Sequence, residues 1–123
     1  MQYHDFKEIL TPSFVYDNRC ILEAFQSLRS EVPKPILKIL FPLKSFAYVD
    51  ALRFMVPLVD GFSASSLFEA RLAREIIGST GSVHFTTPGL RPDEFEGVLD
   101  LCNYVSFNSL RQWQQYHHSV TGR

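Results

Sequence analysis

A single lysine closes an apolar run and is followed at once by residues that end a strand. The run extends from Ile36 to Leu43, and Lys44 precedes Ser45-Phe46-Ala47. A lysine amine held at the mouth of an α/β barrel and shielded from water can lose its proton and form an imine with an aldehyde. The sequence therefore predicts a nucleophilic amine at Lys44.

Composition and charge are those of an ordinary globular domain. The chain has 123 residues, 46% hydrophobic and 20% charged, with a net charge of −1. Nucleic-acid binding is not expected, because phosphate contacts need clustered Lys and Arg. The first residues do not form a signal peptide, and no apolar run reaches the about 20 residues that cross a bilayer. We expect a cytoplasmic protein without membrane contact.

The two cysteines and the pattern of acids and histidines do not predict a metal site. Cys20 and Cys102 are far apart, and we expect two reduced, partly buried thiols. His84 on a predicted strand is interpreted as a packed histidine, and His117 and His118 as solvated residues.

Strand-like and helix-like segments alternate along the chain, and the strands begin about 22 residues apart. Asp17 or Asn18 can cap the first helix, and Glu69 is spaced for a capping box with Ser65 or Ser66. Arg71, Arg74 and Glu75 are interpreted as the solvated face of one helix. The predicted strands are 36–43, 58–62, 83–86 and 104–107. The predicted helices are 18–30, 48–55, a third from Ser65 or Ser66 to 77, a fourth that begins after Pro92 and includes Cys102, and a last one that begins near 109.

The short strands, mostly apolar on both faces, predict a parallel sheet covered by helices. Right-handed βα repeats leave two α/β solutions, an open doubly wound sheet or a closed (β/α)8 barrel of the TIM type. Because the sequence has no glycine-rich dinucleotide loop, we favour the barrel. Four βα units make half of a barrel that needs about 250 residues, so we expect a fragment.

Four segments in order carry a resemblance to a known family: Thr11 to Asp17, Leu43 to Ala47, Asp60 to Leu72, and Phe107 to Ser109. Together they resemble the fold-type III pyridoxal-phosphate decarboxylases, the family of ornithine, arginine and diaminopimelate decarboxylases. The Lys-small-Phe-Ala form of the second segment and Phe-Asn-Ser in the last are similar to the carboxynorspermidine decarboxylase branch.

The resemblance implies the roles of three residues. Lys44 would hold pyridoxal 5'-phosphate as an internal aldimine and take part in catalysis. Ser63 stands where related decarboxylases usually carry an aspartate, so a hydroxyl replaces a charge there, and Asp60 is not taken as its substitute. Ser66 aligns with a serine near the cofactor. For both serines, local capping of the third helix is the alternative, and Thr86 to Gly89 can line the pocket or form a plain turn.

The resemblance also implies domains, partners and a reaction. Residues 1–11 would lead from an absent or partial β domain, and residues 12–123 would form the first half of the barrel. The parent protein would be a homodimer that decarboxylates carboxynorspermidine or carboxyspermidine to norspermidine or spermidine in polyamine biosynthesis. The chain alone would be inactive. The alternatives are a non-catalytic pyridoxal-phosphate-binding barrel, an ornithine- or diaminopimelate-type decarboxylase, and a fragment without activity.

Overall fold

Four short parallel strands form a single sheet in the computed structural model, which describes residues 9–31 and 36–120. The remaining residues, including most of the segment 1–11 assigned to a domain junction, lie outside the described ranges. The strands are β1 (Leu40–Pro42), β2 (Gly61–Ala64), β3 (Ser82–Thr86) and β4 (Tyr104–Ser106). The helices are α1 (Asn18–Glu31), α2 (Val49–Met55), α3 (Leu67–Ile77), α4 (Phe95–Leu101) and α5 (Leu110–Val120), with 3-10 turns η2 (Leu43–Ser45) and η3 (Pro92–Glu94).

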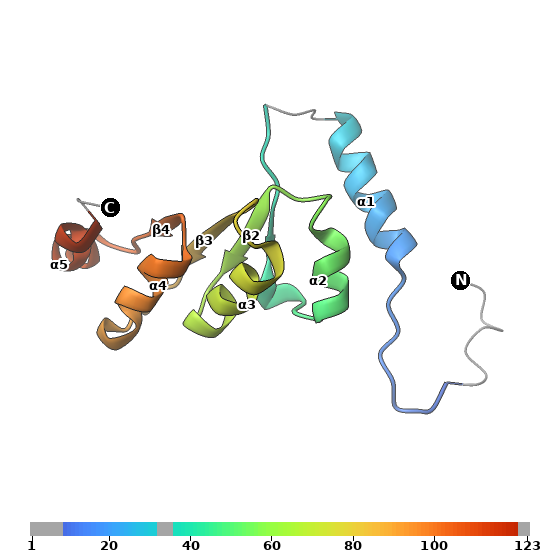
Figure 1. Ribbon diagram of the computed structural model, residues 1–123, viewed down its shortest axis with the longest axis horizontal. Coiled ribbons are helices and arrows are strands. Elements are labelled where there is room, and N and C mark those ends of the chain that lie inside the picture. Colours follow the sequence, from blue (N-terminus) through green and yellow to red (C-terminus); the bar gives the residue numbers. More distant parts are fainter. Residues whose placement is uncertain (1–8, 32–35, 121–123) are drawn as a thin grey trace.

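Each strand pairs with the strand that precedes it in the chain, in the order β1-β2-β3-β4. Figure 1 shows α2, α3 and α4 on one side of this sheet. A doubly wound sheet reverses its strand order and carries helices on both faces, whereas a barrel keeps consecutive neighbours under one layer of helices. The described residues therefore form four successive βα units of the barrel type, as the sequence predicts.

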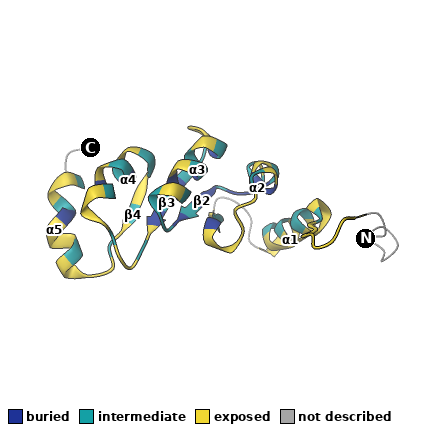
Figure 2. Cartoon of the chain, turned by 90° about the horizontal axis from the view of Figure 1, so that it is seen from below, coloured by how far each residue is buried: buried dark blue, intermediate teal, exposed yellow. Residues whose placement is uncertain are grey.

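The hydrophobic core lies between the sheet and these three helices. Phe62, Val83 and Phe85 point into it from β2 and β3, and Ala70 and Ala73 let α3 approach the strands closely. Figure 2 shows the buried residues concentrated in this layer, while α1 is exposed or intermediate throughout. Burial of these side chains removes apolar surface from water and provides the main stabilisation of the domain.

The other face of the sheet is polar along β2 and β3 but apolar at Leu40 and Pro42 of β1, so the expectation of strands that are mostly apolar on both faces holds for β1 alone. Side chains alternate between the two faces along a strand. Phe62 and Val83 are paired and buried, and the next residue of each strand, Ser63 or His84, lies on the opposite face. Thr86 and Tyr104 lie on that side too and are exposed. In a closed barrel this face is the interior.

Two strands begin several residues later than predicted, and the limits of the other two differ by one residue. The first begins at Leu40 rather than Ile36, and it gives way to η2 at Leu43. The second begins at Gly61 rather than Leu58, because the N–H groups of Leu58 and Val59 both donate to the Met55 carbonyl and close the end of α2. Hydrogen bonding of the turn therefore overrides the apolar pattern at these positions.

The helix boundaries follow the capping residues. Asp17 Oδ1 accepts the Arg19 N–H across 2.9 Å at the start of α1. Ser66 Oγ accepts the Glu69 N–H across 3.2 Å at the start of α3, and Gly78 ends that helix with φ 62. A positive φ suits glycine because it has no Cβ. The predicted first and third helices are confirmed as α1 and α3, with boundaries that differ by one or two residues.

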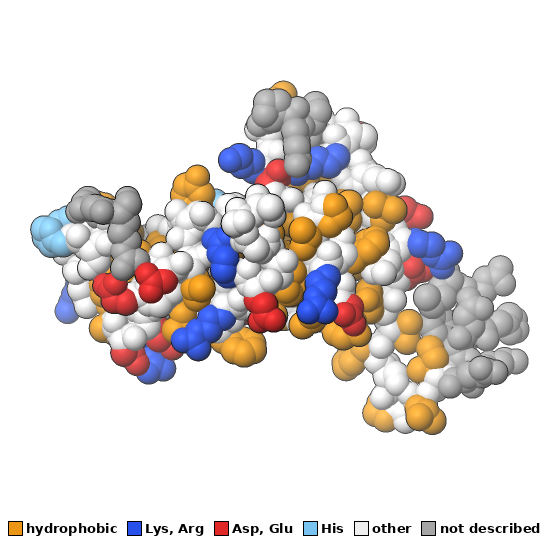
Figure 3. Space-filling model, viewed as in Figure 1, with side chains coloured by type: hydrophobic (Ala, Val, Ile, Leu, Met, Phe, Trp, Pro, Cys, Tyr) orange, Lys and Arg blue, Asp and Glu red, His pale blue; other side chains and the backbone are white. Residues whose placement is uncertain are grey.

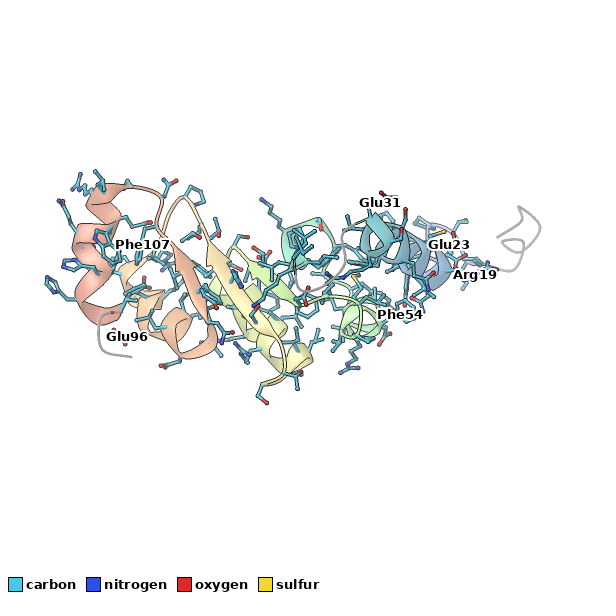
Figure 4. All side chains as sticks on the ribbon, turned by 90° about the horizontal axis from the view of Figure 1, so that it is seen from above. Arg19, Glu23, Glu31, Phe54, Glu96 and Phe107 are labelled. Carbon is cyan, nitrogen blue, oxygen red and sulfur yellow. The ribbon has the colours of Figure 1, made fainter. Side chains whose placement is uncertain are left out.

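The last helix contacts α4 and the loop after β4 through aromatic side chains. Tyr116 of α5 packs on Phe95 of α4 with ring centroids 4.4 Å apart, and Trp113 packs edge-on against Phe107 at 5.3 Å. Figure 4 shows Phe107 on the chain between β4 and α5.

Among residues 9–31 and 36–120, no helix is long and apolar enough to cross a membrane.

The segment before α1 carries exposed apolar side chains, and Figure 3 shows hydrophobic residues gathered there at the lower right. Leu10 and Phe14 are exposed. Tyr16 packs edge-on against Phe46 and Tyr48, with centroids 6.1 and 5.1 Å apart. These contacts connect the segment to the loop directly after Lys44.

An ion pair fixes the amino end of the sheet. Arg29, near the end of α1, binds Asp60 and donates to the Leu37 carbonyl across 2.8 Å. The same Asp60 oxygen accepts the Ile39 N–H across 2.7 Å, and the Asp60 N–H donates to the Ile39 carbonyl. One carboxylate therefore joins α1, the approach to β1 and the approach to β2.

A second arginine forms a similar set of hydrogen bonds at the amino ends of β3 and β4. Arg74, near the end of α3, donates to Asn103 Oδ1 across 2.7 Å and to the Leu101 carbonyl. Asn103 Oδ1 also accepts the Val83 N–H across 2.9 Å. Since Arg74 is half-buried and binds four carbonyl or amide oxygens, its interpretation as part of a solvated face is wrong.

Replacing Asp60 should destabilise the protein more than replacing a surface aspartate. Asp60→Ala leaves the partly buried Arg29 without its carboxylate and the Ile39 N–H without its acceptor, and we expect a loss of about 2–3 kcal/mol. Asp93→Ala removes an exposed ion pair with Arg91 and should cost less than about 1 kcal/mol. Urea denaturation measures both, and equal losses would contradict the proposed importance of Asp60.

Gly61 should not tolerate a side chain. A Cβ at this position would collide with the backbone oxygen of Ser82 on the neighbouring strand, whereas a Cβ at Gly89 would meet open space. Gly61→Ala should therefore destabilise the protein by about 1–3 kcal/mol, and Gly89→Ala should leave the melting temperature nearly unchanged. Thermal denaturation followed by circular dichroism compares the two variants.

Candidate active site

A pocket lies at the carboxyl ends of the first three strands. Its volume is about 340 Å³. β1 and η2 provide Pro42 and Lys44, the end of β2 and the turn after it provide three residues, and β3 provides Thr86. Carboxyl ends of parallel strands meet at one edge, where (β/α)8 enzymes hold their active sites. The lining residues are Pro42, Lys44, Ser63, Ala64, Ser65 and Thr86.

Lys44 projects from a short turn with fixed backbone geometry. Leu43 is fully buried on one side of it. The Phe46 N–H donates to the Leu43 carbonyl across 3.1 Å, and Ser45 Oγ donates to the Pro42 carbonyl across 2.7 Å. These bonds hold the lysine backbone directly after β1, so its amine is directed from the strand end.

The expectation that Lys44 is shielded from water is wrong for the described chain, in which this side chain is exposed. The reason is geometric: four strands form an open sheet rather than a closed barrel, so the described residues leave the pocket open to water. Desolvation of the amine requires additional residues around the pocket or a bound ligand. The position of Lys44 beside a pocket agrees with the expected chemistry, and its catalytic role stays a prediction.

The two predicted serines have different surroundings. Ser63 lines the pocket, and it pairs in register with Pro42 of β1. Ser66 is instead the N-cap of α3, where its hydroxyl accepts the Glu69 N–H, and it does not belong to the residues that line the pocket. The capping alternative therefore describes the contact that Ser66 makes. A role of either serine in cofactor binding remains a prediction.

Ser65 is a polar pocket residue that the sequence analysis does not predict. The sequence offers it only as a possible start of the third helix, but it lies before the N-cap and lines the pocket. Its hydroxyl donates to Glu69 Oε2 across 2.8 Å, and its N–H donates to the same oxygen across 2.6 Å. The available signal was its place two residues after Ser63, on the same side of an extended segment. Thr86 lines the pocket as one of the two alternatives expected.

Asp60 lies at the opposite end of the strands. It contributes to a larger hollow of about 550 Å³ together with Lys38, Ser82 and Asn103. Its carboxylate is bonded to Arg29 and to the Ile39 N–H. Asp60 therefore does not supply a carboxylate beside Lys44, and it does not replace the aspartate that Ser63 stands in for.

His84 is a packed residue on the inner face of β3. Its ring stacks on Tyr104 with centroids 4.3 Å apart, and its Nε2 lies 3.1 Å from Ser82 Oγ. Partial burial lowers the pKa of His84 below its usual value, and the positive charge of Lys38 adds to this effect. The interpretation of His84 as a packed histidine is confirmed.

The two cysteines differ in their surroundings. Burial raises the pKa of the Cys102 thiol to about 11, whereas Cys20 is exposed, so the expectation of a partly buried thiol holds for Cys102 and is wrong for Cys20. His117 packs on Trp113 and on the exposed His118, so the expectation of two solvated histidines holds for His118 alone. Within the described part of the chain, no group of three His, Cys, Asp or Glu residues is arranged to hold a metal ion.

Three relatives support one family of enzymes, although no family model matches the chain. The chain is 34% identical over 113 residues to carboxyaminopropylagmatine decarboxylase of Synechocystis, covering 89% of the chain and 28% of that protein. It is 27% identical over 111 residues to carboxynorspermidine/carboxyspermidine decarboxylase of Campylobacter jejuni, covering 90% and 28%. A Herminiimonas arsenicoxydans enzyme of the same name is 29% identical over 108 residues, covering 88% and 29%.

A solved structure agrees with the sequence relatives. The crystal structure of Campylobacter jejuni carboxynorspermidine decarboxylase with norspermidine superposes with a TM-score of 0.83 and 26% identity, covering 92% of this chain and 30% of that one. The chain is homologous to part of these decarboxylases. It spans less than a third of the length of each relative. The expected resemblance and the barrel-type fold are confirmed.

Protonation of His84 should make stability fall in acid. Because its pKa is lowered in the folded state, the unfolded chain binds this proton more readily, and the contribution of His84 is retained above pH 6.5 and lost as the pH falls below it. Imidazole NMR should give His84 a pKa below 6.5. His84→Gln should reduce the loss of stability between pH 7.5 and 5.5, unlike His118→Gln. A pKa at or above 6.5 would contradict this assignment.

Proposed function

We propose that the protein containing this chain is a pyridoxal-phosphate-dependent decarboxylase of a carboxylated polyamine. The observation that carries the proposal is Lys44 in a pocket at the carboxyl end of the sheet, in a chain homologous to decarboxylases with such substrates. The amine is a nucleophile that fits an aldehyde. The pocket position is the one that this fold uses for catalysis.

The donor set fits the aldehyde end of the cofactor. Lys44 brings the amine, and Ser63, Ser65 and Thr86 bring three hydroxyls around it. Pyridoxal phosphate, when bound, supplies an electron sink for the pair of electrons left by departing carbon dioxide. The described lining contains no second cation, so residues outside it would hold the phosphate.

Residues of this chain would bind and orient the substrate and would transfer a proton. Lys44 Nζ can take up and release a proton beside the reacting carbon once closure of the site removes water from it. Leu43 anchors the turn in the core, which keeps the amine at a constant position. Ser63 extends from the neighbouring strand and can donate or accept one hydrogen bond on the Lys44 side of the pocket.

The proposed substrates are carboxynorspermidine and carboxyspermidine. A second candidate is carboxyaminopropylagmatine, because a decarboxylase of that name has the highest identity of the three relatives described. The three compounds share an α-amino acid end and differ in the amine or guanidine chain beyond it. Decarboxylation rates of the intact protein on each compound, with ornithine and diaminopimelate as further substrates, would separate them. Preference for either amino acid would contradict the polyamine proposal.

The proposal includes the arrangement of the whole protein. Residues 12–123 would form the first part of the barrel, after a junction at residues 1–11. A homodimer in the cytoplasm is part of the same proposal. Sedimentation of the intact protein tests the dimer, and a monomer at micromolar concentration would contradict it.

Lys44 should be the residue that captures the cofactor. Incubation of the intact protein with pyridoxal phosphate followed by borohydride should fix one cofactor per chain, located by peptide mass spectrometry. Lys44→Ala should abolish the product because no other described lysine lines the pocket. Lys38→Ala, at the opposite end of the strands, is the matched control and should retain it. Cofactor attached at another lysine in the unaltered protein would refute the proposal.

A further inference from the structure

The hydroxyl groups of the pocket differ in what they can offer a ligand. Lys44 is the cation of the lining, and no carboxylate lies among the described lining residues. A hydroxyl has one proton to donate and two lone pairs with which to accept. Its role therefore depends on where its proton is directed, and for Ser65 the structure defines this direction.

The hydroxyl proton of Ser65 is donated to Glu69. Ser65 Oγ lies 2.8 Å from Glu69 Oε2, and the Ser65 N–H donates to the same oxygen across 2.6 Å. An ionised carboxylate can only accept hydrogen bonds, so Ser65 must be the donor of this pair. The lone pairs of Ser65 Oγ are then left for the pocket, which the residue lines.

Glu69 is itself held in place by the start of α3. It lies in the first turn, is half-buried, and its N–H donates to Ser66 Oγ. The amino end of a helix commonly attracts phosphate, but here the Glu69 carboxylate already accepts from the backbone. A second anion at this side of the pocket would meet a negative charge and an accepting hydroxyl.

We propose that Ser65 is a binding residue that accepts a hydrogen bond from a protonated nitrogen, and that Glu69 is the positioning residue that directs it. The nitrogen belongs to Lys44 or to the amine of a bound ligand. This inference rests on the proposed function and deepens it by orienting the cofactor. Ser65 and Glu69 would then serve the nitrogen bonded to the aldehyde carbon, and the phosphate would be held by residues other than these two.

The orientation can be tested with pyridoxal and pyridoxal phosphate as parallel probes. The intact protein is incubated with each probe and borohydride, and adduct at Lys44 is quantified by mass spectrometry against probe concentration. Ser65→Ala should raise the half-maximal concentration of both probes by the same factor, about three- to tenfold. Ser65→Thr keeps the hydroxyl and should stay near the original value.

Three results would overturn the inference. A loss confined to pyridoxal phosphate would place Ser65 at the phosphate, and an unchanged half-maximal concentration in Ser65→Ala would remove it from the binding site. Equal losses in Ser65→Ala and Ser65→Thr would deny the hydroxyl a role. Absence of any adduct at Lys44 in the unaltered protein is a different failure, because it refutes the proposed function itself.

Glu69→Gln tests the positioning role separately. An amide can donate a hydrogen bond, so it no longer forces the Ser65 proton away from the pocket. Capture of both probes should weaken about three- to tenfold. Glu75→Gln changes an exposed acid on the same helix and should have no effect on capture. A Glu69→Gln protein that melts earlier but captures both probes normally would reduce Glu69 to a helix cap and overturn its positioning role.

Discussion

The Arg29–Asp60 ion pair determines where the sheet begins. Asp60 Oδ2 accepts both the arginine and the backbone N–H of Ile39, and the Asp60 backbone pairs with the same residue. Because β1 is only three residues long, its own ladder of hydrogen bonds is small. A charge-assisted contact at its approach adds strength and fixes the register relative to β2. Arg74 and Asn103 perform the same function for β3 and β4.

These two contacts place the stabilising polar groups at one end of the strands and leave the other end for chemistry. Asp60, Asn103 and the arginines use their hydrogen-bonding capacity on the backbone at the amino end. Lys44, Ser63 and Thr86 project at the carboxyl end, where they line one pocket. Because the strands pair in a fixed register, residues that are far apart in the sequence lie side by side at that edge. The same division between stability and catalysis is typical of (β/α)8 barrels.

Ser65 and Glu69 show how a capping interaction can extend into a site. The segment Ser65-Ser66 turns the chain from β2 into α3, and its two hydroxyls act in opposite senses. Ser66 Oγ accepts from the helix, whereas Ser65 Oγ donates to the helix side chain. A turn that satisfies its own backbone in this way also gives the pocket a hydroxyl with a defined polarity. The capping box was visible in the sequence, but the direction of Ser65 was not.

The sequence by itself determined the alternation of elements, the start of the first helix at Asp17 or Asn18 and of the third at Ser65 or Ser66, and the place of Lys44 after the first strand. These features depend on local hydrogen bonding and on apolar spacing, which neighbouring residues decide. The sequence alone could not predict the contacts of Arg74, because its partners Leu101 and Asn103 are far from it in sequence. The apolar pattern also predicted the start of β2 too early, since hydrogen bonds to the Met55 carbonyl form a turn there. Tertiary structure decided which of three neighbouring serines line the pocket and how exposed Lys44 is, because both depend on strands brought together across the sheet.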